Sequence, residues 1–126
     1  MKFEYTAEQL KAQDYLILLI LNENGFNTKR VNIEKVTPKK VYVDEYIPHK
    51  GYLKNIYHHD VGGDIEGDTK GLKMFGTLTK VTLSYSILLL ESDVETAQEQ
   101  ITNIAIKQIE NRIALLQRQR ELIEGQ

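Results

Sequence analysis

Apolar positions along the chain follow three successive patterns, and together these patterns predict an α+β fold. An unbroken apolar run comes first, alternating segments follow, and a helical stripe fills the last third. We expect a short N-terminal helix, an antiparallel β-sheet of about 3–5 strands with a long glycine-rich loop, and a long C-terminal helix or helix pair. A chain of 126 residues is expected to be a single domain, 1–126, with an α/β core (1–91) and a helical oligomerisation arm (92–126).

The first segment, KFEYTAEQLKAQDYLILLILNENGF, favours a helix after a short extended lead-in. Thr6 is a candidate N-cap, Gln9 stands three residues later as a capping box requires, and Gly25 is a suitable C-terminal stop. The apolar run at 15–21 covers every face of such a helix, so it would have to be buried on all sides. A buried strand over the same residues is the alternative, because a run of this length fits both structures.

Alternation then predicts strands at 30–36 and 39–47. In the second of these, Val41, Val43 and Ile47 share one face, which we expect to be buried.

The stretch GTLTKVTLSYSILLL (76–90) predicts one further long strand. Leu88 and Leu90 make its last turns apolar on both sides, so its C-terminal end should be covered on both faces.

Between these strands lies a polar segment, 48–76, that contains Pro48 and six of the eight glycines of the chain. We expect a long loop with at most a short turn or strand at GYLKNIY (51–57). Loops of this length are often functional or mobile.

The last third of the chain predicts a helix capped by Ser92 or Asp93. Neither glycine nor proline interrupts it before Gly125, so it could run about 45 Å as one helix, or form two helices with a bend. Part of it should project beyond a domain of this size. Its apolar stripe collects Val94, Ala97, Ile101, Ile104, Ala105, Ile109, Leu115, Leu116, Leu122 and Ile123, with Ile113 at the edge.

Three polar side chains, Gln108, Arg112 and Gln119, fall within this stripe, and Arg120 lies at its edge. Buried polar residues at a helix seam can fix register and oligomer order. Alternatively, they lay their stems along apolar surface and keep their polar ends in water, or they recognise a ligand. We expect self-association through this half of the helix, because the domain has little left to cover it.

Composition excludes several classes of protein. The chain has no cysteine, which removes disulfides, thiolate chemistry and cysteine-based zinc sites. A net charge of −2 argues against a dedicated nucleic-acid binder. The run at 15–21 is too short to span a bilayer and no secretory signal is visible, so we expect a cytoplasmic protein without a membrane partner.

The stretch NIYHHDVGGDIEGDTKG (55–71) offers two histidines and four acids that could bind a metal ion. Adjacent histidines on an extended chain point to opposite faces, however, and aspartate followed by glycine is ordinary turn chemistry. The stretch lacks the Gly-Lys-Ser/Thr of a phosphate loop, and the chain has no Gly-x-Ser-x-Gly. We therefore assign no metal ligand, no cofactor and no catalytic residue, and expect a protein that is not an enzyme.

Three functions remain as hypotheses. The first is a non-enzymatic oligomeric interaction or inhibitor protein that assembles with itself through its C-terminal helix and binds a larger protein. Another is a metal-dependent hydrolase that uses the loop from His58 to Asp68.

The remaining hypothesis is a binding protein that holds a small anionic molecule at a subunit interface. Arginines would bind phosphate, glutamines the edges of a base or sugar, and a tyrosine would stack. The layout of first helix, antiparallel sheet and helical arm is similar in outline to phage proteins that sequester cyclic nucleotide signals, and this resemblance implies a cyclic nucleotide as ligand. The candidate ligand- or partner-binding residues are Gln108, Arg112, Gln119, Arg120, Tyr85 and Tyr42.

Overall fold

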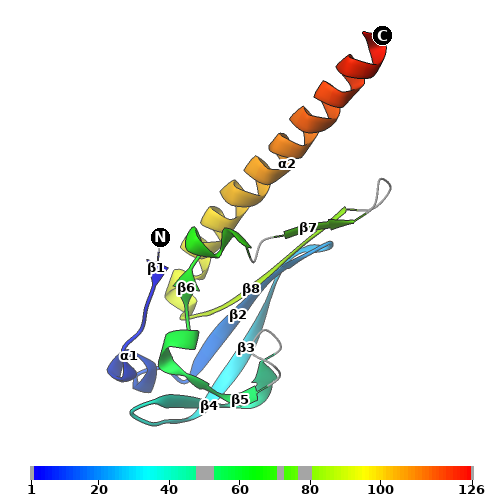
Figure 1. Ribbon diagram of the computed structural model, residues 1–126. Helices are drawn as coiled ribbons and strands as arrows, with labels where there is room; N and C mark the ends of the chain where they lie inside the picture. Colours follow the sequence, from blue (N-terminus) through cyan, green and yellow to red (C-terminus); the bar gives the residue numbers. More distant parts are fainter. Residues whose placement is uncertain (1, 48–52, 71–72, 77–80, 126) are drawn as a thin grey trace.

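A curled antiparallel sheet with one long helix across it dominates the computed structural model, which describes residues 2–47, 53–70, 73–76 and 81–125 (Figure 1). The described strands form a six-stranded sheet in the order β5-β4-β3-β2-β8-β7 and a two-stranded sheet of β1 and β6. The α+β class is confirmed. The elements are β1 (Lys2–Phe3), α1 (Ala7–Lys11), β2 (Tyr15–Asn22), β3 (Gly25–Val36), β4 (Lys40–Ile47), β5 (Leu53–Tyr57), the 3₁₀ helix η2 (His58–Asp60), β6 (Gly63–Asp64), η3 (Gly67–Lys70), β7 (Lys73–Gly76), β8 (Val81–Leu89), η4 (Glu91–Asp93) and α2 (Val94–Glu124).

The N-terminal helix α1 begins with the expected capping box. The backbone N–H of Gln9 donates to the Thr6 hydroxyl at 3.2 Å, and the backbone N–H of Thr6 donates to the Gln9 side chain at 2.8 Å. Leu10 anchors the helix because its side chain is fully buried against the sheet.

The helix ends at Lys11, so the expectation that it continues towards Gly25 is wrong. Residues 15–22 form the central strand β2 instead, which is the alternative that the sequence left open. Leu16 and Leu18 are buried on one face of this strand, and Leu19 and Leu21 on the other. A strand covered on both faces has no polar alternation, which is why its sequence resembled a buried helix.

Gly25 serves a turn rather than a helix end. It pairs with Asn22 across the β2–β3 hairpin and has a φ of +96°, in the left-handed region that glycine adopts without strain. The Asn22 side chain accepts a hydrogen bond from the backbone N–H of Asn24 at 2.9 Å, which closes the two-residue turn.

Both strands predicted by alternation, β3 and β4, are present. Val41, Val43 and Ile47 are almost completely buried, as expected. Asp44 links the two strands, since its carboxylate accepts hydrogen bonds from the backbone and the side chain of Asn32, at 3.0 and 2.9 Å. These hydrogen bonds lower the pKa of Asp44 below its usual range.

The glycine-rich segment has more structure than a loop. Within it, β5 pairs with β4, so a strand exists at 53–57. Residues 51 and 52 lie outside the described residues. β6 pairs with β1, the first strand of the chain. Val61 and Ile65 pack this segment against the core, because both side chains are buried in the apolar clusters.

The single strand predicted over 76–90 is divided between two strands, β7 and β8. Gly76 belongs to β7 and pairs with Val81, the first residue of β8. Sequence could not show this division because residues 77–80 contain no glycine or proline. The expected burial of both faces at the end of β8 is confirmed, since Leu88 and Leu89 are fully buried in different clusters.

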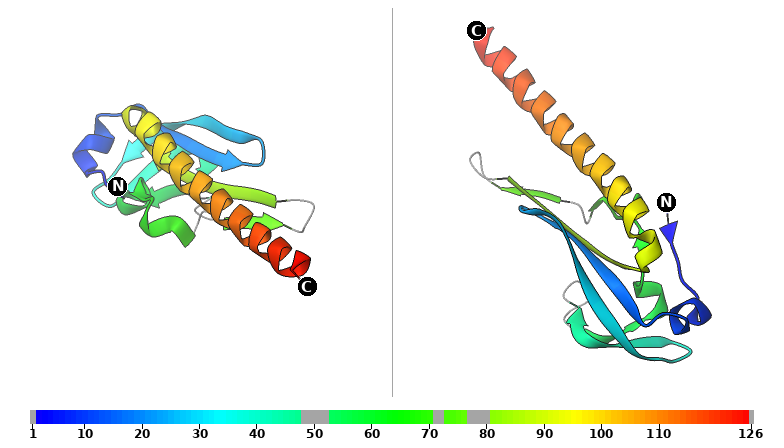
Figure 2. Two further views of the ribbon diagram at one scale, coloured as in Figure 1. Left: turned by 90° about the horizontal axis from the view of Figure 1, so that it is seen from above. Right: turned by 180° about the vertical axis from the view of Figure 1, so that it is seen from behind.

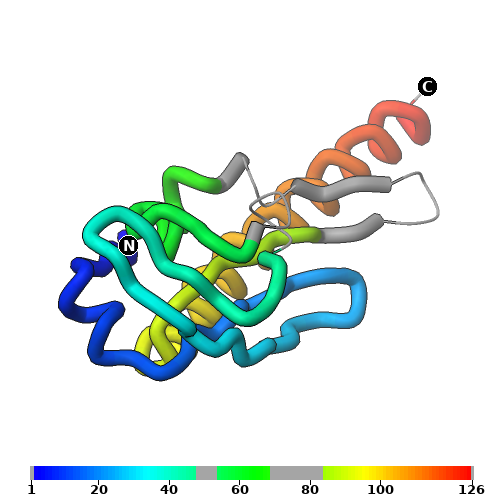
Figure 3. Tube along the Cα trace, turned by 90° about the horizontal axis from the view of Figure 1, so that it is seen from below, coloured from blue at the N-terminus to red at the C-terminus, as the bar shows by residue number. Residues whose placement is uncertain are grey.

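Two apolar clusters lie on opposite faces of the sheet. One fills the inside of the curl and includes Leu10 of α1; the other lies between the sheet and α2. Seen from below, the chain from β2 to β5 curls while α2 extends away from it (Figure 3). Seen from above, α2 crosses the sheet and continues past it (Figure 2).

The C-terminal helix α2 is one continuous helix of 31 residues. Asp93 is its N-cap residue, but the carboxylate of Asp93 accepts a hydrogen bond from the Tyr5 hydroxyl at 2.6 Å and makes no capping bond. The first part of α2 contacts the core. Ala97, Ile101 and Ala105 are buried there, and the partly buried Val94 and Ile104 pack against the same cluster. Within the described ranges, no helix is both long and apolar enough to cross a membrane.

Candidate functional site

The projecting half of α2, residues 106–124, exposes more large apolar side chains than any other part of the described structure. We call it the stalk; it rises beyond the sheet in the two side views (Figure 1; Figure 2, right). Isolated exposed apolar residues are ordinary, whereas a continuous group of them marks an interaction surface. The side chains are Ile106 (48% exposed), Ile109 (40%), Ile113 (49%), Leu115 (59%), Leu116 (48%), Leu122 (64%) and Ile123 (75%).

Two adjacent rows of side chains run along the stalk, each with alternating spacings of three and four residues. This spacing keeps a row on one side of a helix. The apolar seam consists of Ile106, Ile109, Ile113, Leu116, Arg120 and Ile123. The mixed seam consists of Ala105, Gln108, Arg112, Leu115, Gln119 and Leu122.

The mixed seam continues the face of α2 that packs on the sheet. Ile101 and Ala105 are buried there, and Gln108, one turn further, is half-buried. The apolar seam is rotated by about 100° from it, since each of its residues follows a mixed-seam residue directly. The first residues of the apolar seam, Ile106 and Ile109, are therefore exposed to solvent, although the mixed-seam residues beside them face the sheet.

These two rows explain why polar residues interrupt the apolar stripe that the sequence predicted. Gln108, Arg112 and Gln119 all lie on the mixed seam, so the neighbouring seam is interrupted only by Arg120. Sequence reasoning missed Ile106 and placed Ile113 at the edge, although the 3-4 spacing was available as a signal.

Arg120 forms an ion pair with Glu124 on the next turn of the same helix, with Nε donating to Oε1 at 2.8 Å. Both side chains are well exposed, so this pair contributes little to stability. It nevertheless neutralises the single charge on the apolar seam.

Tyr85 lies beneath α2 rather than on a free surface. Its half-buried ring packs beside Ile65, Ile101 and Ile104. Burial, followed by the nearby carboxylate of Asp68, raises the pKa of Tyr85 above its usual range. This ring is part of the helix–sheet contact and is not brought together with the stalk residues.

Tyr42 is also separate from the stalk. It is on β4, which lies at the end of the molecule opposite to the C-terminus of α2 (Figure 1). The Lys35 ammonium lies 5.5 Å from the centre of its ring. The other four predicted site residues all lie on α2, spread over about 18 Å of its length, and both tyrosines lie elsewhere.

Other tyrosines of the sheet carry cations in the same way. The distances from cation to ring centre are 3.9 Å for Arg30 over Tyr15, 4.9 Å for Lys40 over Tyr57 and 5.0 Å for Lys54 over Tyr46. These cation–π contacts hold the rings and the basic side chains together on the surface of the sheet.

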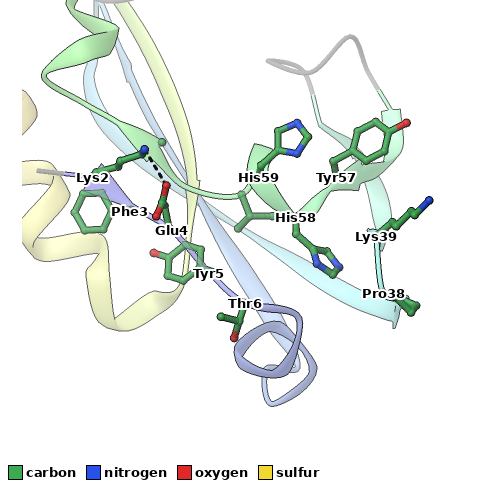
Figure 4. Close-up of a pocket in the computed structure, with 12 residues that line it drawn as sticks. Lys2, Phe3, Glu4, Tyr5, Thr6, Pro38, Lys39, Tyr57, His58 and His59 are labelled. Atoms are coloured by element: carbon green, nitrogen blue, oxygen red, sulfur yellow. Dashed lines mark ion pairs between the residues drawn. The ribbon is translucent and has the colours of Figure 1, made fainter.

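A groove separates the N-terminal segment from η2, and His58 and His59 line it (Figure 4). The two rings point apart: His59 stacks on Tyr57, with ring centres 5.4 Å apart, whereas His58 is turned towards Lys39. The His58 Nε2 atom is buried and has no hydrogen-bond partner among the described residues. The two histidines lie in the 3₁₀ helix η2 and not on the extended chain that the sequence predicted, and their rings point to different sides of it.

Asp64 of the same segment serves a turn. The Asp64 carboxylate accepts a hydrogen bond from the backbone N–H of Gly67 at 3.1 Å. In the part of the chain that the structure describes, no three histidine, aspartate or glutamate side chains are grouped so that they could hold a metal ion. The hydrolase hypothesis has no further support from this geometry.

Comparison with protein-family models, with curated proteins and with solved structures finds no match to this chain.

Proposed function

We propose that the chain is a non-enzymatic interaction protein that assembles with further copies of itself through the stalk. The observation that carries this proposal is the stalk itself: seven large apolar side chains, each 40–75% exposed, on a helix whose last buried residue is Ala105. Covering the exposed half of one such side chain stabilises an assembly by about 1 kcal/mol.

A second copy suits this surface better than the chain's own domain does. Ala105 is the last buried residue of α2, Gln108 is half-buried, and every described stalk residue beyond Gln108 is exposed. The stalk is already helical and anchored at one end, so association does not have to nucleate the helix. Self-association is the simplest way to cover the same surface on every copy.

Sedimentation velocity of the untagged full chain, over a series of micromolar concentrations, tests the proposal. Assembly predicts a mass above that of one chain, 14.5 kDa, and a fraction of assembled protein that rises with concentration. A single species with the mass of one chain at every concentration would contradict it.

A second function, capture of a small anionic molecule such as a cyclic nucleotide at the subunit interface, is favoured by one observation. The guanidinium of Arg112 and the amides of Gln108 and Gln119 project from one row, next to the apolar seam. A guanidinium binds phosphate and amides bind the edges of a base or sugar. A thermal-shift series with cyclic and linear nucleotides tests this; the expected shift should disappear in Arg112→Leu, and no shift with any nucleotide sets the idea aside.

A further inference from the structure

We propose that copies of this chain pair along the apolar seam as a parallel, in-register coiled coil. This inference rests on the proposed function and adds the orientation and the contact residues. Its basis is the 3-4 spacing of the seam, which places Ile106, Ile113 and Arg120 at the a positions of a heptad repeat and Ile109, Leu116 and Ile123 at the d positions.

The position of Arg120 decides the orientation. In a parallel, in-register pair each seam residue meets its own copy, so five layers are apolar and one contains arginine. In an antiparallel pair that matches Ile106 with Ile123, each Arg120 meets Ile109, and two of the six layers contain arginine. The parallel arrangement therefore keeps more apolar contact and confines both arginines to one layer near the free end of the stalk.

That arginine layer is tolerable because each Arg120 is held by Glu124 of its own helix at 2.8 Å. A single polar a position also fixes register, since any shift along the seam would place arginine against isoleucine or leucine. Arg120 thus disfavours the shifted alternatives at a cost in affinity.

The residues that flank the seam are compatible with parallel pairing. In this arrangement a g residue of one helix faces the e residue five positions later on its partner. Arg112 then faces Gln117, and Gln119 faces Glu124, so a donor meets an acceptor in both cases. Ala105 faces Glu110, and no like charges meet at these positions.

The seam is also accessible to a partner helix without disturbing the sheet. Ala105 is 7% exposed against the sheet, whereas the next residue, Ile106, is 48% exposed. A partner stalk can therefore pack from the first seam residue onward, with the domains side by side at one end.

Single-cysteine crosslinking of the full chain tests this arrangement, since the chain has no cysteine of its own. Ile109→Cys is oxidised with copper phenanthroline, and Asn111→Cys, two residues away and outside the seam, is the matched control. An equimolar mixture of Ile109→Cys and Arg120→Cys probes the antiparallel pairing. Sedimentation of each reduced variant establishes whether it assembles.

Parallel pairing predicts that Ile109→Cys becomes mostly covalent dimer, and that Asn111→Cys stays largely uncrosslinked. In an antiparallel pair the two Ile109 positions are about 16 Å apart along the axis, too far for a disulfide. Assembly with heterodimers from the mixture, but without Ile109→Cys dimers, would overturn the inference and leave the proposed function standing. A monomer by sedimentation would overturn both.

Discussion

Leu115 and Leu116 are adjacent leucines with similar exposure, 59% and 48%, but they belong to different rows of the stalk. Leu115 lies on the mixed seam beside Arg112, and Leu116 occupies the middle of the apolar seam. This pair separates the contribution of the apolar seam from the general effect of an exposed leucine.

Leu116→Lys should raise the dissociation constant of the assembly at least tenfold, because it removes an apolar layer and introduces like charges in its place. A tenfold change corresponds to about 1.4 kcal/mol. Leu115→Lys adds the same charge outside the apolar seam and should change the constant much less. Sedimentation equilibrium of both variants measures the difference; equal weakening would mean that the apolar seam is not the contact.

Arg120→Leu should tighten the assembly, by about tenfold, because it replaces the one charged layer of the seam with an apolar layer. It also removes the exposed ion pair with Glu124, which contributes little. Arg118→Leu lies outside the seam and is the matched control. Dilution series followed by light scattering would show the effect, and an assembly weakened by Arg120→Leu would argue that this arginine makes a favourable contact across the interface.

The two halves of α2 should respond differently to truncation of an isoleucine. Ile101 is 1% exposed between α2 and the sheet, so Ile101→Ala should lower the free energy of unfolding by about 2–4 kcal/mol. Ile113→Ala removes an exposed side chain and should leave the stability of the monomer nearly unchanged at dilute concentration. Urea denaturation of both variants checks this; similar losses would show that the stalk packs on its own domain.

Tyr5 should make the fold sensitive to alkaline pH. Its pKa is raised above the ordinary value of about 10, first by burial and then by the hydrogen bond to Asp93. Because the folded state favours the neutral phenol, this stabilisation is complete below about pH 10 and is lost as the pH rises further. Tyr85 acts in the same direction, with its pKa also raised by burial.

Tyr5→Phe should therefore flatten the fall in the free energy of unfolding above about pH 10. It should also cost about 1–2 kcal/mol near neutral pH through the lost hydrogen bond. Urea denaturation at several pH values measures both quantities, with Tyr85→Phe as a parallel variant. An unchanged alkaline slope in Tyr5→Phe would contradict this role for Tyr5.

Periodicity predicted the strands with one exposed face and the long final helix. Val41, Val43 and Ile47 alternate with polar residues because only one side of β4 is buried deeply. The same reasoning failed for β2, whose two faces are both covered, so Leu18 and Leu19 are buried side by side and no alternation remains.

Short elements in the glycine-rich segment were beyond the reach of periodicity. β6 has two residues, and Val61 and Ile65 are single apolar positions among polar ones, too few for a pattern. Their burial depends on contacts with β1 and β8, which are distant in the sequence.

The candidate site was predicted in part. The projection of α2 followed from its length, but the roles of Tyr85 and Tyr42 depend on which strands neighbour the helix, and alternation carries no such information. The 3-4 spacing of the apolar seam from Ile106 to Ile123 can be read directly in the sequence. The apolar residues of the sheet-facing side, where Gln108 and Arg112 lie, merge with it into one wide stripe in the sequence.

The mass of the untagged full chain in solution, measured by sedimentation velocity at micromolar concentration, tests the central claim most directly. Self-assembly through the stalk predicts a species heavier than 14.5 kDa whose population falls on dilution and in Leu116→Lys. A chain that sediments as a monomer throughout the concentration range would contradict the account.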